Sequence, residues 1–235
     1  MVKLNIFKYI SNNNIKNKIL SITFFCVFFF SSDCLNGKIF DESIINNFHN
    51  SLKLNNVSNE NINERVEKLK ISIEDTFNYN KMIKYIYGYQ WKKLEQYERN
   101  ELSQTFFNFI SFNYAKRFKE IDKLNFKFDG VENINETRIL VKTIMLSSEN
   151  EPIKFYYVFE YEEEKWKVFD ILLDGSISEI SVKKNDFKRT ISDEGASGLK
   201  NISKKCFSIR SFNKMFLIWC SFIGKSRRNC NSINF

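Results

Sequence analysis

The sequence predicts an α+β fold with N-terminal helices, then a four-stranded antiparallel twisted sheet, then a C-terminal helix. Apolar residues recur three and four positions apart through residues 62–118 and again after residue 185, as they do on the buried face of a helix. Between these regions lie four segments rich in aromatic and β-branched residues. The last three are separated by turns too short for a crossover, so these neighbouring strands should be antiparallel.

Four helices are predicted in order along the chain. Residues 62–77 carry a single apolar stripe, and a shorter helix is expected over residues 81–91. Residues 95–118 give the strongest pattern, because apolar side chains repeat every four residues: Leu102, Phe106, Ile110, Tyr114 and Phe118. A closing helix over residues 185–202 is expected to bury four apolar side chains: Phe187, Ile191, Leu199 and Ile202.

The four predicted strands cover residues 123–129, 137–146, 153–161 and 165–173. The first alternates apolar and polar residues, as a half-buried strand does. The last two are apolar on both faces, so both faces need cover, from helices on one side and from further helices or a carried ligand on the other.

Strict alternation predicts which residues of the last strand share a face. One face would hold Trp166, Val168 and Leu172, and the other Phe169, Ile171 and Leu173. Asp174 and Gly175 follow as a turn that leads to the closing helix.

The net charge of +8 lies at the two ends of the chain. Residues 1–37 contribute +3 and residues 206–235 contribute +5, whereas residues 38–205 hold 27 basic and 27 acidic side chains. The central part therefore lacks the basic surface of a nucleic-acid-binding protein, and no nucleic-acid partner is predicted.

A secretory signal peptide is predicted for residues 1–37. Lys16 and Lys18 precede an apolar run of 12 residues, Ile19–Phe30, and small polar residues follow. A transmembrane helix needs about 20 apolar residues. Export followed by cleavage is the prediction, and an uncleaved anchor is the alternative.

Cysteine and histidine usage excludes several kinds of site. All five cysteines lie within residues 1–37 and 206–235, and His49 is the only histidine. Residues 38–205 therefore need no disulfide and offer neither a zinc site nor a His-based catalytic triad. No metal, cofactor or catalytic residue is predicted.

Three segments of the chain carry distinctive motifs. In the first, Gly88 and Trp91 precede Glu95-Gln96, and an apolar helix leads to Tyr114-Ala115. The second is the strand "WKVFD" with its Asp-Gly-x-Ser turn, and the third is the closing segment "NDFKRTISDEGASGL". Together these segments resemble the MlaC family, also called the toluene-tolerance family. The likeness covers residues 62–205 with order and spacing largely kept, whereas residues 206–235 have no counterpart.

The resemblance implies a periplasmic carrier within residues 38–205. Such a protein binds a glycerophospholipid by its acyl chains, in a cavity between sheet and helices, as cargo rather than as a cofactor. It passes the lipid between an outer-membrane lipoprotein–porin complex and an inner-membrane Mla-type ABC transporter complex. The predicted lipid-binding residues come from the helices and from one face of the strands: Phe77, Trp91, Phe106, Ile110, Tyr114, Val141, Phe155, Tyr157, Val168, Ile171 and Leu173.

Two other functions remain open at this point. Asp170 lies in an apolar strand, where burial could raise its pKa and make it a general base, although it could equally be a structural acid bonded to neighbouring groups. The apolar sheet could also bind another protein rather than a lipid.

The C-terminal extension, residues 206–235, contains the short apolar run 215–223 between basic residues. It could lie on an anionic membrane surface, or it could be an extension with no selected role. The second interpretation is favoured here.

Overall fold

The structure is a computed structural model that describes residues 38–148 and 151–207, with side chains as far as Asn201. The chain divides into two units, Met1–Phe40 and Asp41–Phe235. The helices and strands that the structure describes all belong to the second unit. The predicted signal peptide and most of the predicted extension lie outside the described residues.

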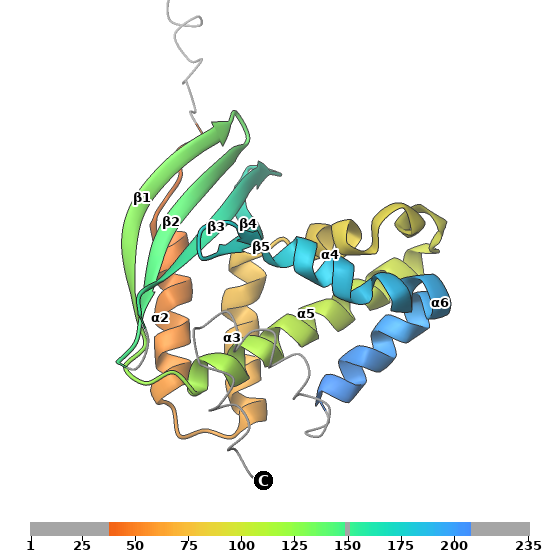
Figure 1. The fold of residues 1–235 in the computed structure, drawn as a ribbon, viewed down its shortest axis with the longest axis horizontal. Helices are drawn as coiled ribbons and strands as arrows, with labels where there is room; N and C mark the ends of the chain where they lie inside the picture. The colour runs from red at the N-terminus through yellow and green to blue at the C-terminus, as the bar shows by residue number, and fades with distance from the viewer. Residues whose placement is uncertain (1–37, 149–150, 208–235) are drawn as a thin grey trace, which may run out of the picture. The chain divides into compact units, whose positions relative to one another are not determined.

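The second unit has the predicted α+β architecture (Figure 1). Its elements follow in this order: α2 (Ser43–Val57), α3 (Ile62–Thr76), α4 (Tyr79–Tyr87), the 3-10 helix η1 (Gly88–Lys93), α5 (Gln96–Lys119), β1 (Asn125–Asn135), β2 (Arg138–Leu146), β3 (Ile153–Glu162), β4 (Lys165–Leu173), β5 (Ile177–Ser178) and α6 (Glu179–Phe207). The predicted helices over 62–77 and 95–118 and the strands over 137–146, 153–161 and 165–173 agree with α3, α5, β2, β3 and β4 to within about two residues.

Several elements differ from the prediction. Strand β1 ends six residues beyond the predicted end at residue 129, and the helix predicted over residues 81–91 is divided between α4 and η1. The sheet has five strands rather than four, because β5 adds a two-residue strand that pairs Ser178 with Leu172 and Ile177 with Leu173. Helix α2 was not predicted at all, since its segment is rich in Asn, which has a weak helix propensity. Helix α6 begins at Glu179, six residues before the predicted start of the closing helix.

The sheet is an antiparallel meander in the order β1-β2-β3-β4-β5. Between β3 and β4 the register shifts, because Val158 pairs with Asp170 while Phe159 pairs with Val168. Phe169 is therefore the extra residue of a β-bulge, and the strand changes parity there.

The bulge corrects the predicted faces of the last strand. Trp166 and Val168 are buried before the bulge, and Ile171 and Leu173 are buried after it, on the same side of the sheet. The predicted grouping of Leu172 with Trp166 and Val168 was wrong, because strict alternation does not hold across a bulge.

One face of the sheet is buried and the other is half-buried. On β3, Phe155, Tyr157 and Phe159 are buried against the helices, whereas the residues between them are half-buried. On the opposite face, Phe169 meets the ring of Tyr85 edge to face, with 5.6 Å between centroids. The opposite face is thus partly covered by side chains from α4 and from the sheet itself.

The core between the sheet and the first helices is built from aromatic rings. Phe48 of α2 packs against Phe77 and Tyr157, with centroids 5.0 and 6.4 Å away. His49 stacks on Phe126 at 3.9 Å, and its Nε2 shares a hydrogen bond with the Tyr157 hydroxyl, 2.9 Å away. Burial lowers the pKa of His49 to about 3, and the charge of Lys53 adds to this effect, so the imidazole is neutral at pH 7.

Local sequence signals explain where two of the helices begin. The Asn61 side chain accepts hydrogen bonds from the backbone N–H groups of Asn63 and Glu64, and the Glu64 carboxylate accepts one from the Asn61 N–H. This reciprocal pattern is a capping box, which satisfies N–H groups that the helix leaves unpaired. At the start of α4, the Asn78 side chain accepts a hydrogen bond from the Lys81 N–H.

Helix α6 runs from the end of the sheet across α5 and α4 and then turns (Figure 1). The turn lies at Gly195, whose φ of 58° and ψ of −140° interrupt the helix. Glycine adopts this conformation without the steric cost that a Cβ would add. The first half of α6 consequently packs beside the end of β4, where the candidate site lies.

Candidate functional site

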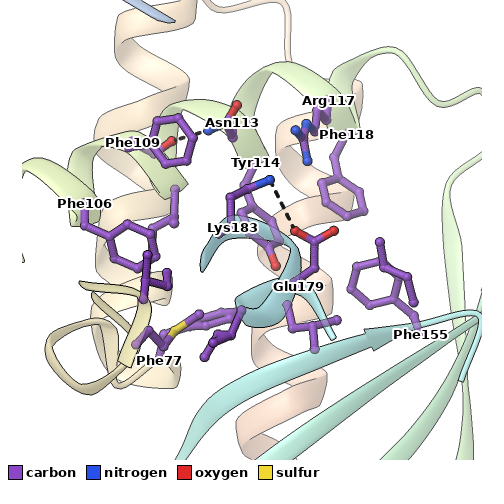
Figure 2. A pocket seen from close by; sticks show the side chains of 16 residues that line it. Phe77, Phe106, Phe109, Asn113, Tyr114, Arg117, Phe118, Phe155, Glu179 and Lys183 are labelled. Atoms are coloured by element: carbon purple, nitrogen blue, oxygen red, sulfur yellow. Dashed lines mark hydrogen bonds and ion pairs between the residues drawn. The ribbon is translucent and has the colours of Figure 1, made fainter. Parts of the chain in front are cut away.

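A cavity of about 70 Å³ lies between the buried face of the sheet and helices α4, α5 and α6 (Figure 2). The sheet contributes Phe155 of β3 and Ile171 and Leu173 of β4. The cavity therefore lies on the helix-covered face of the sheet, between the sheet and the helices.

Most of the cavity wall is aromatic or aliphatic. Tyr114 of α5 is central to the wall, because its ring meets Phe77 edge to face at 5.8 Å and stacks on Phe118 at 5.4 Å. Phe118 in turn meets Phe155 of the sheet at 6.3 Å. These rings join the end of α3, the C-terminal turns of α5 and strand β3 into one continuous apolar surface.

Four polar or charged side chains complete the wall. Asn113 and Arg117 come from α5, and Glu179 and Lys183 come from the first turns of α6. The Lys183 Nζ lies 3.8 Å from Glu179 Oε2, and only 14% and 19% of these two side chains are exposed. The Asn113 Nδ2 donates a hydrogen bond of 2.8 Å to the Phe109 carbonyl.

The hydroxyl of Tyr114 is electrostatically coupled to this polar group. Burial raises the pKa of Tyr114, the negative charge of Glu179 raises it further, and the positive charge of Arg117 lowers it. The charges that act on this hydroxyl thus come from both α5 and α6.

Asp170 holds the beginning of α6 in place. Its Oδ1 accepts hydrogen bonds from the Ile171 and Ile180 N–H groups, at 2.7 and 3.1 Å, and its Oδ2 accepts one of 2.6 Å from the Ser178 hydroxyl. Burial raises the pKa of Asp170, while the three hydrogen bonds act in the opposite direction. Asp170 does not line the cavity, and its bonding is that of a structural acid.

Residues 42–202 match the family model described as MlaC protein. The chain belongs to the MlaC family. The resemblance found in the sequence is thereby confirmed at the level of the family. No curated protein matches the chain.

A solved structure has the same fold. It is a phospholipid-binding protein from Ralstonia solanacearum in complex with a phospholipid, and it is similar to this MlaC-family chain with a TM-score of 0.61. The likeness covers 70% of this chain and 94% of the other, at 16% sequence identity. At this identity the comparison shows a shared fold.

In this MlaC-family chain, the structure brings seven of the eleven predicted lipid-binding residues to the cavity: Phe77, Phe106, Ile110, Tyr114, Phe155, Ile171 and Leu173. The other four lie elsewhere. Val141, Tyr157 and Val168 are fully buried in the core. Trp91 packs against Tyr87, with 6.0 Å between ring centroids, beside an open polar groove along α4 and α5. Binding of lipid by any of these residues stays a prediction.

The sequence analysis missed the contribution of α6 to the cavity. Glu179, Ile180 and Lys183 have helical spacing, but the prediction began the closing helix at residue 185. The β-branched residues of "SISEISV" favoured a strand or loop there. The signal that could have found them is the i to i+4 Glu–Lys pair, which stabilises a helix.

In residues 38–148 and 151–207, no group of three or more His, Cys, Asp or Glu residues could hold a metal ion. Among the helices described there, none has the length and apolar character needed to cross a membrane.

Proposed function

We propose that this MlaC-family protein is a carrier that binds a glycerophospholipid by its acyl chains in the cavity between the sheet and α4, α5 and α6. The observation that supports this most is the wall itself. Its apolar side chains come from α4, α5, α6, β3 and β4 and from Phe77 at the end of α3, whereas its polar groups come from α5 and α6 alone. Apolar pockets with a few convergent polar groups are typical of ligand sites. The phospholipid in the related fold from Ralstonia solanacearum suggests the class of ligand.

Burying acyl chains against such an apolar wall provides enough free energy to bind a lipid. Burying one methylene group contributes about 0.8 kcal/mol, so roughly ten methylenes contribute about 8 kcal/mol. That equals the binding free energy of a micromolar complex before the costs of association are subtracted. Acyl chains alone can therefore provide useful affinity.

The small volume of the cavity sets a requirement for lipid binding. An apolar cavity of about 150 Å³ holds one benzene ring, whereas this cavity measures about 70 Å³. An acyl chain consequently requires its walls to move apart.

The proposed setting is the periplasm, reached by export through the predicted signal peptide in residues 1–37. There the protein would take lipid from one of two membrane complexes and deliver it to the other. The partners proposed are an outer-membrane lipoprotein–porin complex and an inner-membrane Mla-type ABC transporter complex.

No observation favours a catalytic role for Asp170 over its structural one, since its carboxylate is held by three hydrogen bonds at the junction of β4, β5 and α6.

The carrier function is tested by incubating lipid-depleted protein with vesicles that contain a fluorescent phosphatidylglycerol and separating the two by gel filtration. We expect the fluorescent lipid to elute with the protein. If it stays entirely with the vesicles, the carrier proposal fails.

A further inference from the structure

The polar part of the cavity wall carries two cations and one carboxylate. Figure 2 shows Arg117 on the α5 side of the cavity and Glu179 with Lys183 on the α6 side. The acyl chains of a lipid need none of these groups. Charged side chains in an apolar wall are costly unless they are paired, and an anionic ligand would offer these two cations a further partner.

Lys183 is held by carboxylates at ion-pair distance only. Its Nζ lies 3.8 Å from Glu179 Oε2 and 3.9 Å from Asp186 Oδ2. A charge-assisted hydrogen bond between an ammonium and a carboxylate measures about 2.7–2.9 Å. Within the described part of the chain, the Lys183 ammonium thus makes no short hydrogen bond, and its donors remain available to a closer anion.

We propose that Arg117 and Lys183 bind the phosphate of the lipid headgroup at the polar side of the cavity, and that this phosphate replaces Glu179 as the partner of Lys183. This inference rests on the proposed carrier function and names the chemical group that the site selects. The ligand is then a phosphodiester lipid rather than an uncharged diacylglycerol.

Glu179 has a defined part in this exchange. It is paired with Lys183 before a phosphate arrives, and it lies in the first turn of α6, where the helix dipole stabilises negative charge. A phosphodiester adds a second negative charge, so that two anions then face the two cations Arg117 and Lys183. Glu179 consequently competes with the headgroup, and its removal should strengthen binding.

The test measures binding of three soluble probes by calorimetry: dihexanoylphosphatidylglycerol, dihexanoylglycerol and glycerol 3-phosphate. Lys183→Gln and Arg117→Gln should each weaken binding of the phospholipid by about tenfold, the loss expected for a hydrogen bond to a charged group. Binding of dihexanoylglycerol should not change. Glu179→Gln should strengthen binding of the phospholipid severalfold and so provides a variant whose effect cannot come from misfolding.

The control is Arg189→Gln, which removes a cation from the same helix at a side chain that is 93% exposed. It should bind all probes as the wild type does. Glycerol 3-phosphate should bind far more weakly than the phospholipid, and equal binding would mean a site for free phosphate esters instead of a headgroup. Equal losses for the two acylated probes in Lys183→Gln would overturn the inference while leaving the carrier function standing. If the wild type binds neither acylated probe, the carrier proposal itself fails.

Discussion

The Asp170 carboxylate accepts a hydrogen bond from the backbone N–H of Ile180, with 3.1 Å between Oδ1 and N. This bond joins β4 to the first turn of α6, and the Ser178 hydroxyl adds a second connection at 2.6 Å. Because Ile180 itself lines the cavity, the residue that looked like a possible catalytic base in the sequence instead fixes one wall of the proposed binding site.

Replacing this carboxylate should weaken the fold. Asp170→Asn keeps one acceptor oxygen but replaces the other with an NH₂ group, so it cannot satisfy all three donors. We expect the free energy of unfolding to fall by about 1–3 kcal/mol, measured by urea denaturation. The control is Asp174→Asn, at an exposed turn position with a φ of 51°, a conformation that Asn tolerates well. It should change stability by less than about 0.5 kcal/mol, and equal stability of Asp170→Asn and wild type would contradict the assigned role.

The single histidine predicts a specific dependence of stability on pH. The pKa of His49 is about 3 in the folded protein, against an ordinary value of 6.5. Below pH 6.5 the unfolded chain binds a proton that the folded chain does not, so stability falls as the pH decreases from about 6.5 toward 3. The slope from this residue is about 1.4 kcal/mol per pH unit.

This effect is measurable because the protein has one imidazole. Its NMR resonance should show no titration between pH 8 and pH 5. His49→Gln should be less stable overall, since it loses the stacking on Phe126, but should lack the histidine part of the pH dependence. A resonance that titrates near pH 6.5 would show that His49 is not buried as described.

Filling the cavity should block lipid binding. Ile110 is buried at the wall of the cavity, and Ile110→Trp adds an indole ring to it. We expect lipid affinity to fall by at least about tenfold, since that requires the loss of only about 1.4 kcal/mol, the contribution of fewer than two buried methylenes. The matched control is Ile71→Trp on α3, at a side chain that is 69% exposed. Unchanged uptake of fluorescent lipid by Ile110→Trp would place the ligand elsewhere.

The C-terminal extension should be dispensable for binding. Among the described residues, which end with α6 at Phe207, those that line the cavity extend no further than Lys183. Removal of residues 208–235 should therefore leave phospholipid affinity within about twofold of the full chain, by the same calorimetric measurement. A large loss of affinity would give these residues a part in the site.

Much of the fold was predictable because its elements follow simple periodicities. The apolar repeat Leu102, Phe106, Ile110, Tyr114 and Phe118 predicted α5, and it also predicted part of the cavity wall, since one stripe of a helix faces one side. The features that were missed depend on tertiary structure. The bulge at Phe169 arises from pairing with β3, and β5 is a strand only because Leu172 and Leu173 lie beside it.

The polar wall of the site was missed for a related reason. Arg117 and Lys183 are 66 residues apart in the sequence, and nothing in either local pattern indicates that α6 folds back onto α5. Val141, Tyr157 and Val168 illustrate the converse, since an apolar strand residue looks the same in a sequence whether it faces a cavity or the core. Only the packing of the helices separates the two cases.

The central claim is that the cavity carries a phospholipid, and the most direct test is native mass spectrometry of the full chain purified after export, followed by thin-layer analysis of the extracted lipid. The account predicts a protein–phospholipid complex in stoichiometric amount, which Ile110→Trp should deplete and Ile71→Trp should retain. A wild-type protein that carries no phospholipid and takes none up from vesicles would contradict it.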